Sequence, residues 1–124
     1  MANIIVKKSK INQRGVFANR DFKKGEVVLK WKPKKILTKK EASALPEEEK
    51  HYVSNYQLNE FILQSPPERY VNHSCEPNTE VINGCDIALR EIKKGEEITS
   101  DYGKDNVFIH FKCNCGSKNC RKFI

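Results

Sequence analysis

The sequence predicts a mostly β fold, made of several small β-sheets with short helices. Its apolar runs are short and rich in β-branched residues, turn signals separate them, and only one stretch carries helix start signals. The chain has 124 residues, of which 38% are hydrophobic and 31% are charged. This length and composition indicate one globular domain with a modest core, and they exclude collagenous and low-complexity classes.

Six short apolar segments are the expected strands. In chain order they are residues 4–6, 16–18, 27–29, 61–63, 81–82 and 87–89. Asn83 and Gly84 tolerate positive φ angles, so the last two strands should form a hairpin around them. The sequence Lys-Lys-Gly-Glu occurs twice, at residues 23–26 and 93–96, and predicts two turns with similar local chemistry.

One stretch, residues 38–58, has the signals of helix. Thr38 followed by Glu41 fits a capping box, in which two side chains cap each other's backbone N–H groups. Pro46 interrupts this helix, and the acidic residues after it suit the first turn of a second short helix running toward Tyr56. The basic excess in residues 20–40 predicts a positive face, for which a solvated edge that opposes aggregation is an equally good explanation.

Five cysteines occur, and three of them lie close together near the C-terminus: Cys113, Cys115 and Cys120. Secreted disulfide frameworks usually combine an even cysteine count with an export signal, so metal ligation is the better interpretation. Zinc suits thiolate ligands and takes four ligands in a structural site. The candidates for the fourth are Cys75, Cys85, His73 and His110. For Cys85 alone, a role as a small hydrophobic residue is favoured.

The polar segment 69–78 contains Asn72 and His73, either of which could contact a ligand. An Asn-His-Ser sequence is by itself equally consistent with a loop held by side-chain to backbone hydrogen bonds. Tyr102 stands before a glycine, and such a tyrosine is usually a packing residue. The sequence has no phosphate-binding loop and no Ser-His-Asp spacing, so hydrolase and nucleotide-triphosphatase functions have no positive support.

Taken together, four segments resemble a SET-domain protein lysine methyltransferase of the compact, single-domain type with a post-SET zinc motif. They are residues 14–18 with 24–26, residues 72–75 with 77–78, residues 98–103, and the C-terminal cysteines with Arg121. Each segment alone is weak, but four in the right order are specific. The resemblance covers nearly the whole chain and divides it into a SET domain, residues 1–110, and a post-SET zinc segment, residues 111–124.

The resemblance implies a C-terminal pseudoknot that brings the Asn72 and Tyr102 segments together, with S-adenosylmethionine on one side and the lysine entering from the other. Tyr102 is the implied catalytic residue. The implied cofactor-binding residues are Arg14, Gly15, Val16, Phe17, Asn72, His73 and Tyr102. Candidates for the lysine channel are Tyr70, Ser100 and Tyr56. The implied ligands of one structural Zn²⁺ are Cys75, Cys113, Cys115 and Cys120, which leaves Cys85 spare.

The implied reaction transfers methyl groups from S-adenosylmethionine to a lysine ε-amine, with S-adenosylhomocysteine as the product. Free lysine has a pKa of roughly 10.4, so an apolar channel is needed to favour the neutral amine. Two positions depart from the family pattern. Ser100 replaces the usual Phe or Tyr, which makes methylation beyond one group possible, and Lys122 stands where relatives often have Gly.

Two other functions compete with this interpretation: a SET-like protein that binds the cofactor with weak or no catalysis, and a zinc-stapled basic module that binds nucleic acid. The net charge of +7 favours the second, although it leaves the Asn72 and Tyr102 motifs unexplained. The expected partner is a protein substrate, histone-like or ribosomal, with nucleic acid secondary and no membrane. The expected location is intracellular and cytoplasmic, or nuclear and chromatin-associated in a eukaryote or as a host-directed effector.

Overall fold

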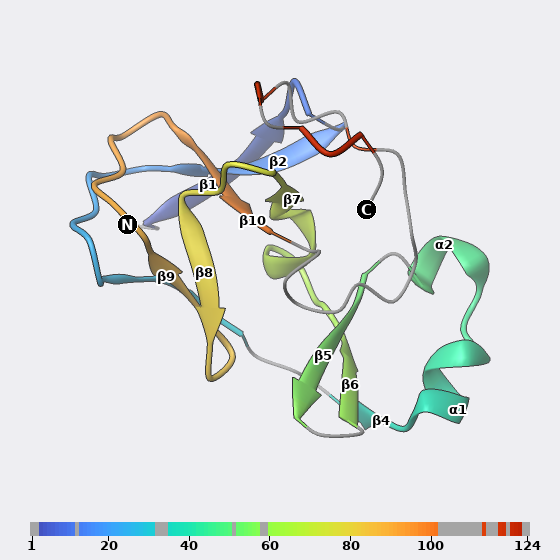
Figure 1. Cartoon of the computed structure of the whole chain (residues 1–124). Coiled ribbons are helices and arrows are strands. Elements are labelled where there is room, and N and C mark those ends of the chain that lie inside the picture. Colours follow the sequence, from blue (N-terminus) through green and yellow to red (C-terminus); the bar gives the residue numbers. More distant parts are fainter. Residues whose placement is uncertain are drawn as a thin grey trace.

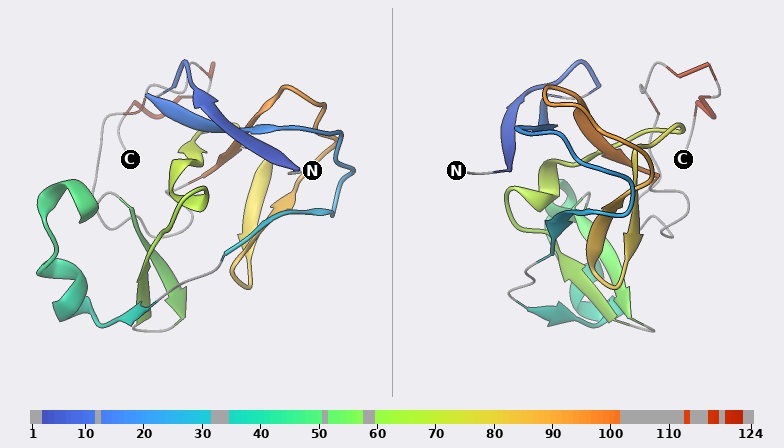
Figure 2. Two further views of the ribbon diagram at one scale, coloured as in Figure 1. Left: turned by 180° about the vertical axis from the view of Figure 1, so that it is seen from behind. Right: turned by 90° about the vertical axis from the view of Figure 1, so that its left-hand side faces the viewer.

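The computed structural model describes residues 3–11, 13–31, 35–50, 52–57, 60–101, 113, 117, 118 and 120–122, without the side chains of 55–57. Within these ranges the chain forms small β-sheets joined by short loops, with a few short helical segments (Figure 1). The mostly β prediction is therefore confirmed. The described C-terminal residues lie at the top of the molecule, and the two helices lie on one side of it, beside the sheet of residues 36–37, 53–57 and 60–63 (Figure 2).

The first sheet has the order β1-β2-β10-β7. Its strands are β1 (Ile4–Lys8), β2 (Arg14–Ala18), β10 (Glu97–Ser100) and β7 (Asn72–His73). β2 pairs antiparallel with both β1 and β10, whereas β10 and β7 run parallel. The parallel pair brings together two segments far apart in the sequence, as the pseudoknot prediction requires. The predicted passage of the C-terminal segment through a loop stays a prediction, because residues 102–112 lie outside the described residues.

Two further three-stranded sheets complete the described β structure. One has the order β3-β9-β8, with β3 (Val27–Lys30), β8 (Thr79–Ile82) and β9 (Cys85–Ala88). The other has the order β4-β6-β5, with β4 (Ile36–Leu37), β5 (Val53–Gln57) and β6 (Glu60–Leu63). The hairpin prediction is confirmed, since Asn83 and Gly84 connect β8 to β9 with φ angles of 50° and 72°.

The helical segments are short: α1 (Lys39–Ser43), α2 (Glu47–Lys50) and the 3-10 turn η1 (Glu68–Tyr70). The capping box is confirmed, because Thr38 Oγ1 accepts from the Glu41 N–H and the Glu41 carboxylate accepts from the Thr38 N–H. No helix within the described ranges is long and apolar enough to cross a membrane.

The prediction that the second helix runs toward Tyr56 is wrong. α2 ends at Lys50, and residues 53–57 form β5 instead. Val53 is a β-branched residue whose side chain is buried with Leu37 and Ala42, while the β5 backbone pairs with β6. Tertiary pairing thus overrides the helical signal of the acidic run.

The two Lys-Lys-Gly-Glu turns have the same conformation. Gly25 and Gly95 have φ angles of 89° and 96°, which a residue with a side chain rarely adopts. In each turn the glutamate accepts a hydrogen bond from the backbone N–H of the first lysine, at 2.9 Å for Glu26 and 3.0 Å for Glu96. The prediction of similar turn chemistry is confirmed.

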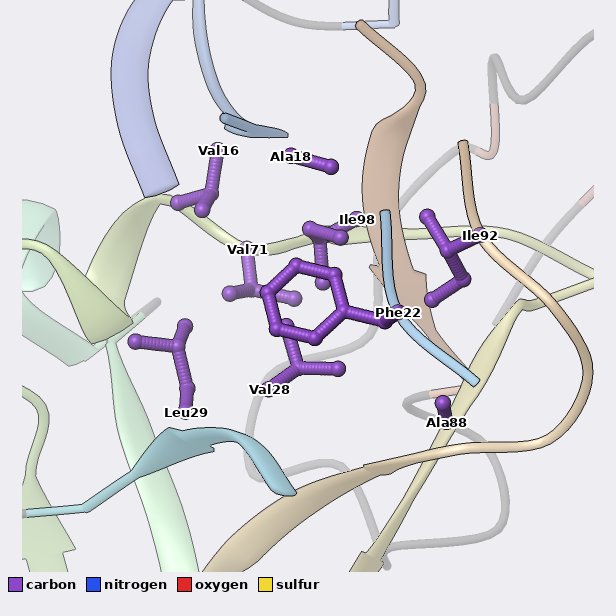
Figure 3. Packing of buried hydrophobic residues seen from close by; sticks show 9 residues of the cluster. All are labelled: Val16, Ala18, Phe22, Val28, Leu29, Val71, Ala88, Ile92 and Ile98. Carbon is purple, nitrogen blue, oxygen red and sulfur yellow. The ribbon is translucent and has the colours of Figure 1, made fainter. Parts of the chain in front are cut away.

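The main core lies between the first sheet, the β3-β9-β8 sheet and the residues just before the two turns. Figure 3 shows the Phe22 ring at its centre with aliphatic side chains around it. Phe22 and Ile92 pair across the core, each with no exposed surface. The other buried members are Val16, Ala18, Val28, Leu29, Val71, Ala88 and Ile98. This core fixes β2, β7 and β10, the strands that carry the candidate site.

Candidate functional site

The parallel pairing of β7 and β10 is the centre of the site. Its register places Asn72 beside Thr99 and His73 beside Ser100. The pairing continues past the strand, because the Ser74 N–H donates to the Ser100 carbonyl at 3.0 Å. The side chains of Asn72, His73 and Ser100 are all buried. The predicted cofactor residue Asn72 therefore lies next to the segment that leads into Tyr102.

The Asn72 amide is held by groups from three other segments. Its Nδ2 donates to the Arg14 carbonyl at 2.9 Å and to Glu97 Oε2 at 2.8 Å, and lies 3.2 Å from Ser9 Oγ. Ser9 Oγ donates to the Glu97 carboxylate, 2.7 Å from Oε1 and 2.9 Å from Oε2. Sequence reasoning identified neither Ser9 nor Glu97, and no local signal marked them.

Gly15 leaves the space in which these groups meet. A Cβ atom placed on Gly15 would lie 2.5 Å from Glu97 Oε2 and 2.9 Å from Ser9 Cβ. Both distances are shorter than the non-bonded contacts that Cβ atoms make in proteins. A residue with a side chain at this position would have to displace Glu97 or Ser9.

A cavity of about 230 Å³ opens beside this cluster, lined by Gln13, Arg14, Tyr52, Arg69, Tyr70 and Asn72. The Arg14 guanidinium lies over the Tyr70 ring, 5.6 Å from its centroid. Arg69 stacks on Tyr52 at 4.2 Å and is held by the Glu49 carboxylate and the Gln64 carbonyl. The walls thus combine guanidinium groups, phenol rings and an amide.

The predicted site residues take different places around this cavity. Arg14 and Asn72 line it, together with Tyr70, which was expected in the lysine channel. The Val16 side chain belongs to the core, so Val16 can offer only its backbone to a ligand. The Phe17 ring is half-buried beneath the Lys7 ammonium. The Tyr102 prediction and the Tyr56 side chain lie outside the described residues.

His73 and two cysteines form a candidate metal centre. The Nε2 atom of His73 is 3.4 Å from Cys75 Sγ, and Cys75 Sγ is 3.9 Å from Cys113 Sγ. One ligand atom from each of these three residues lies within 4.8 Å of the others. Two thiols and an imidazole are donors that zinc accepts. His73, which was expected at the cofactor, lies with these two thiols, and its predicted cofactor role stays a prediction.

Two further cysteines can be placed relative to this centre. Cys120 Sγ lies 3.9 Å from the Cys113 carbonyl oxygen, so Cys120 is close to one member of the cluster. Cys85 lies in β9 and is not a member of the cluster found among the described residues. Cys115 lies outside the described residues, so its predicted role stays a prediction.

Arg121 links the metal centre to the Tyr102 segment. Its backbone N–H and its Nε lie 3.3 and 3.4 Å from Cys75 Sγ, and its guanidinium contacts the buried Asp101 carboxylate at 2.5 Å. These contacts, with Asp101 first, raise the pKa of Arg121 above its ordinary value. Asp101 immediately precedes Tyr102, so the C-terminal segment contacts the start of the predicted catalytic motif.

Burial lowers the pKa of His73, because an imidazolium is costly to desolvate. Asp101, whose Oδ1 is 3.8 Å from Nδ1, opposes this shift, and Arg121 adds to it. The net effect favours the neutral imidazole near neutral pH. This is the form that can bind a metal ion or accept a hydrogen bond.

Comparison with known proteins identifies the family. The SET-domain family model matches residues 13–103, more than half of the chain. The chain belongs to the SET-domain family. Histone-lysine N-methyltransferase 2B of Homo sapiens is 31% identical over 96% of this chain. The variant-silencing SET domain-containing protein of Plasmodium falciparum (isolate 3D7) is 32% identical over 95%. Trithorax of Drosophila virilis, a histone-lysine N-methyltransferase, is 29% identical over 94%.

This SET domain spans only a small part of the relatives it matches, between 3% and 5% of their length. The matched region contains the candidate site residues from Arg14 to Asp101, whereas Ser9 precedes it. The metal-centre residues Cys113 and Arg121 lie beyond the family match, although the pairwise alignments cover nearly all of the chain. SET methyltransferases as a class use S-adenosylmethionine as the methyl donor.

Proposed function

We propose that this SET domain is a protein-lysine N-methyltransferase that transfers methyl groups from S-adenosylmethionine to lysine ε-amines. The observation that carries the proposal is the parallel pairing of β7 with β10, which sets Asn72 and His73 beside Ser100, two residues before Tyr102. The family match and the histone-lysine methyltransferase names of the relatives support the same reaction.

The cavity beside Asn72 is the proposed cofactor site. S-adenosylmethionine carries a carboxylate, an ammonium group and a flat purine, for which the cavity offers a guanidinium, an amide and phenol rings. Arg14 is the available cation, because Arg69 is already engaged by Glu49 and Gln64. The volume is below the roughly 300 Å³ at which ligand pockets usually begin, so the cavity is suited to part of the cofactor.

The cluster of His73, Cys75 and Cys113 fits zinc by its donor set, since thiolates and neutral imidazole are its usual ligands. We assign the ion to Cys75, Cys113, Cys115 and Cys120, with His73 beside them. When bound, zinc supplies a cross-link and no chemistry of its own. Such a cross-link would tie a distinct post-SET segment, residues 111–124, to the SET domain of residues 1–110, next to the contact between Arg121 and Asp101.

Methyl transfer from a sulfonium to an amine is an in-line displacement, so the protein's main task is to align donor and acceptor. The Asn72 side would position the donor, and Tyr102 with Ser100 would position the amine. The Tyr102 hydroxyl orients the nitrogen lone pair rather than removing a proton, since an unperturbed tyrosine has a pKa of about 10. Desolvation in an apolar channel favours the neutral amine.

Ser100 is the proposed determinant of product multiplicity. Its side chain is buried beside His73, where many relatives carry an aromatic ring. A small polar residue leaves room for a water molecule or for an amine that already carries a methyl group. Dimethyl-lysine and trimethyl-lysine among the products would support this role, and monomethyl-lysine alone after exhaustive reaction would contradict it.

The proposed substrate is a basic protein such as a histone, as the names of the relatives indicate for those proteins. A net charge of +7 provides no long-range attraction to a basic partner, so recognition must come from local contacts around the target lysine. Lys23, Lys24, Lys30, Lys39 and Lys40 are exposed in the basic segment 20–40. A nuclear location and a secondary association with nucleic acid are consistent with these features and stay predictions.

The experiment is incubation of the zinc-loaded protein with S-adenosylmethionine and mixed histones or cell lysate, followed by mass spectrometry of the lysines. Methylated lysine that requires both enzyme and cofactor supports the proposal. Unmodified lysine in every fraction, from protein shown to bind the cofactor, would favour the SET-like protein without catalysis. Steeply salt-dependent DNA binding without methylation would favour the nucleic-acid module.

A further inference from the structure

The nitrogen of the Asn72 amide is surrounded by hydrogen-bond acceptors from three other segments. The Arg14 carbonyl and Glu97 Oε2 take its two N–H hydrogens, at 2.9 and 2.8 Å. Both are acceptors that cannot donate. If the amide were turned over, Asn72 Oδ1 would face a carbonyl oxygen and a carboxylate at these distances. The amide therefore has only one favourable orientation.

This orientation decides what Asn72 can offer a ligand. The nitrogen is fully used, and Oδ1 has no hydrogen-bond partner within the described part of the chain. Asn72 also lines the cavity. Because Nδ2 is occupied by these partners, Oδ1 is the amide atom left to offer a hydrogen-bond acceptor to a ligand in this cavity, whereas a turned-over amide would offer a donor. Ligand N–H and O–H groups are favoured by the first arrangement and repelled by the second.

The Glu97 carboxylate is itself held in place. Ser9 Oγ donates to it and in turn accepts from the Ile11 N–H at 3.0 Å. Gly15 provides the space for it, because a Cβ atom there would overlap Oε2. The end of β1, the start of β2, β7 and β10 all contribute a group to this one arrangement. Such a network goes beyond what is needed to pair the strands, whose backbones are already hydrogen-bonded.

We propose that Glu97 is a positioning residue: supported by Ser9, it fixes the Asn72 amide so that Oδ1 accepts a hydrogen bond from the bound cofactor. This inference rests on the proposed cofactor site. Glu97 touches neither the cofactor nor the reacting atoms in this account. Its effect passes through Asn72, so it should alter cofactor affinity and leave turnover at saturating cofactor unchanged.

The test compares Glu97→Met with Glu97→Gln in the zinc-loaded protein. Methionine matches the length of glutamate without offering a strong acceptor, whereas glutamine retains an amide oxygen for Asn72 Nδ2. Glu80→Gln, at an exposed position in β8, is the matched control. Calorimetry gives the Kd for S-adenosylmethionine, steady-state kinetics gives kcat and the cofactor KM, and thermal unfolding gives Tm.

Glu97→Met should raise the Kd and KM at least about tenfold, the usual scale for losing a hydrogen bond to a charged group, with kcat retained. Glu97→Gln should stay within about threefold of wild type because the acceptor is restored. Wild-type affinity in Glu97→Met would overturn the inference. Equal losses in both variants that follow a fall in Tm would also overturn it, since they would indicate a purely structural role.

A second pair of variants covers the case in which Glu97→Met does not fold. Asn72→Asp places a carboxylate against Glu97 and should abolish measurable binding, whereas Asn72→Asp with Glu97→Gln restores an amide opposite a carboxylate and should recover part of it. A double variant no better than the single one would overturn the inference. Failure of the wild type to bind S-adenosylmethionine would instead contradict the proposed function, on which the inference depends.

Discussion

At the scale of single residues, the site depends on the absence of a side chain at Gly15. Gly15 leaves room for the Glu97 carboxylate, and that carboxylate holds the Asn72 amide. The Arg14 carbonyl, one residue before Gly15, is the other partner of the amide. The space left by Gly15 therefore allows the contacts by which β2 and β10 hold the Asn72 amide in β7.

We predict that Gly15→Ala weakens S-adenosylmethionine binding by about tenfold or more, because its Cβ displaces Glu97 from Asn72. Calorimetry measures the Kd directly. Gly84→Ala is the control, since its strained turn, with φ of 72°, lies in the β8–β9 hairpin and should lower Tm with little change in Kd. An unchanged Kd in Gly15→Ala would contradict this account of the site.

The sequence motif predicts Asn72 but not Glu97, and the reason is physical. Glu96 and Glu97 are adjacent and chemically identical, so nothing local distinguishes them. In the turn, the Glu96 carboxylate accepts a hydrogen bond from the Lys93 N–H. Glu97 begins the strand that follows, and its carboxylate accepts from the Asn72 amide instead. Only the pairing of β10 with β7 and β2 separates the two roles.

At the scale of elements, the two Lys-Lys-Gly-Glu turns brace opposite ends of the same core. The Gly25 N–H and the Glu26 carbonyl pair with Ala88, just before the second turn, and Gly95 and Glu96 pair in the same way with Ala18. Phe22 and Ile92 pair between them. The repeat in the sequence thus becomes an approximate symmetry in the fold, with each turn supporting the strand that leads into the other.

We predict that Glu26→Gln lowers Tm at neutral pH and that the difference from wild type closes in acid. The hydrogen bond from the Lys23 N–H, with help from Arg20, lowers the pKa of Glu26 in the folded state. Its stabilisation is therefore complete above the unfolded pKa, about 4.3, and is lost as the pH falls through the lower folded value. Thermal unfolding from pH 7 to pH 3 is the measurement, and a difference that widens in acid would contradict the assignment.

We also predict that Lys122→Gly stabilises the C-terminal segment. Lys122 has a φ angle of 70°, in the left-handed region that favours glycine. Relief of this strain outweighs the greater freedom of glycine in the unfolded chain by about 0.5–1 kcal/mol. Lys118→Gly, where φ is not positive, is the control and should gain nothing in urea unfolding of the zinc-loaded protein. Equal effects of the two substitutions would contradict the strain.

Elements with strong local signals are predictable, and those set by pairing are not. The Thr38 capping box and the Asn83-Gly84 turn follow from hydrogen bonds within a few residues. Residues 53–57 become a strand because β6 pairs with them and Val53 is buried. The two-residue strands β4 and β7 are too short to have a pattern of their own.

At the scale of the whole molecule, the metal centre connects the end of the chain to its middle. Cys113 and Arg121 reach Cys75, and Arg121 also reaches Asp101. The cysteine spacing predicts such a centre, with His73 and Cys75 among the candidates for its fourth ligand, whereas the fold was needed to show that Cys75 meets Cys113. The same contacts join the metal centre to Asp101, so we expect loss of the metal to disturb both.

We predict that Cys75→Ser loses most of the bound zinc and most methyl transfer, whereas Cys85→Ser retains both. Cys75 belongs to the described cluster of donors and contacts Arg121, while Cys85 lies in β9 outside that cluster. Atomic absorption gives the metal content of each purified variant, and labelled methyl transfer gives the activity. Full zinc content in Cys75→Ser would contradict the assigned ligand set.

The most direct measurement is transfer of labelled methyl groups from S-adenosylmethionine to histones by the zinc-loaded wild type and by Tyr102→Phe, with cofactor affinity measured in both. We predict label on lysine with the wild type, loss of at least about a hundredfold in the variant, a scale typical of removing one transition-state hydrogen bond, and an unchanged Kd. Transfer at nearly the wild-type rate by Tyr102→Phe, or no transfer by a wild type that binds the cofactor, would contradict the account.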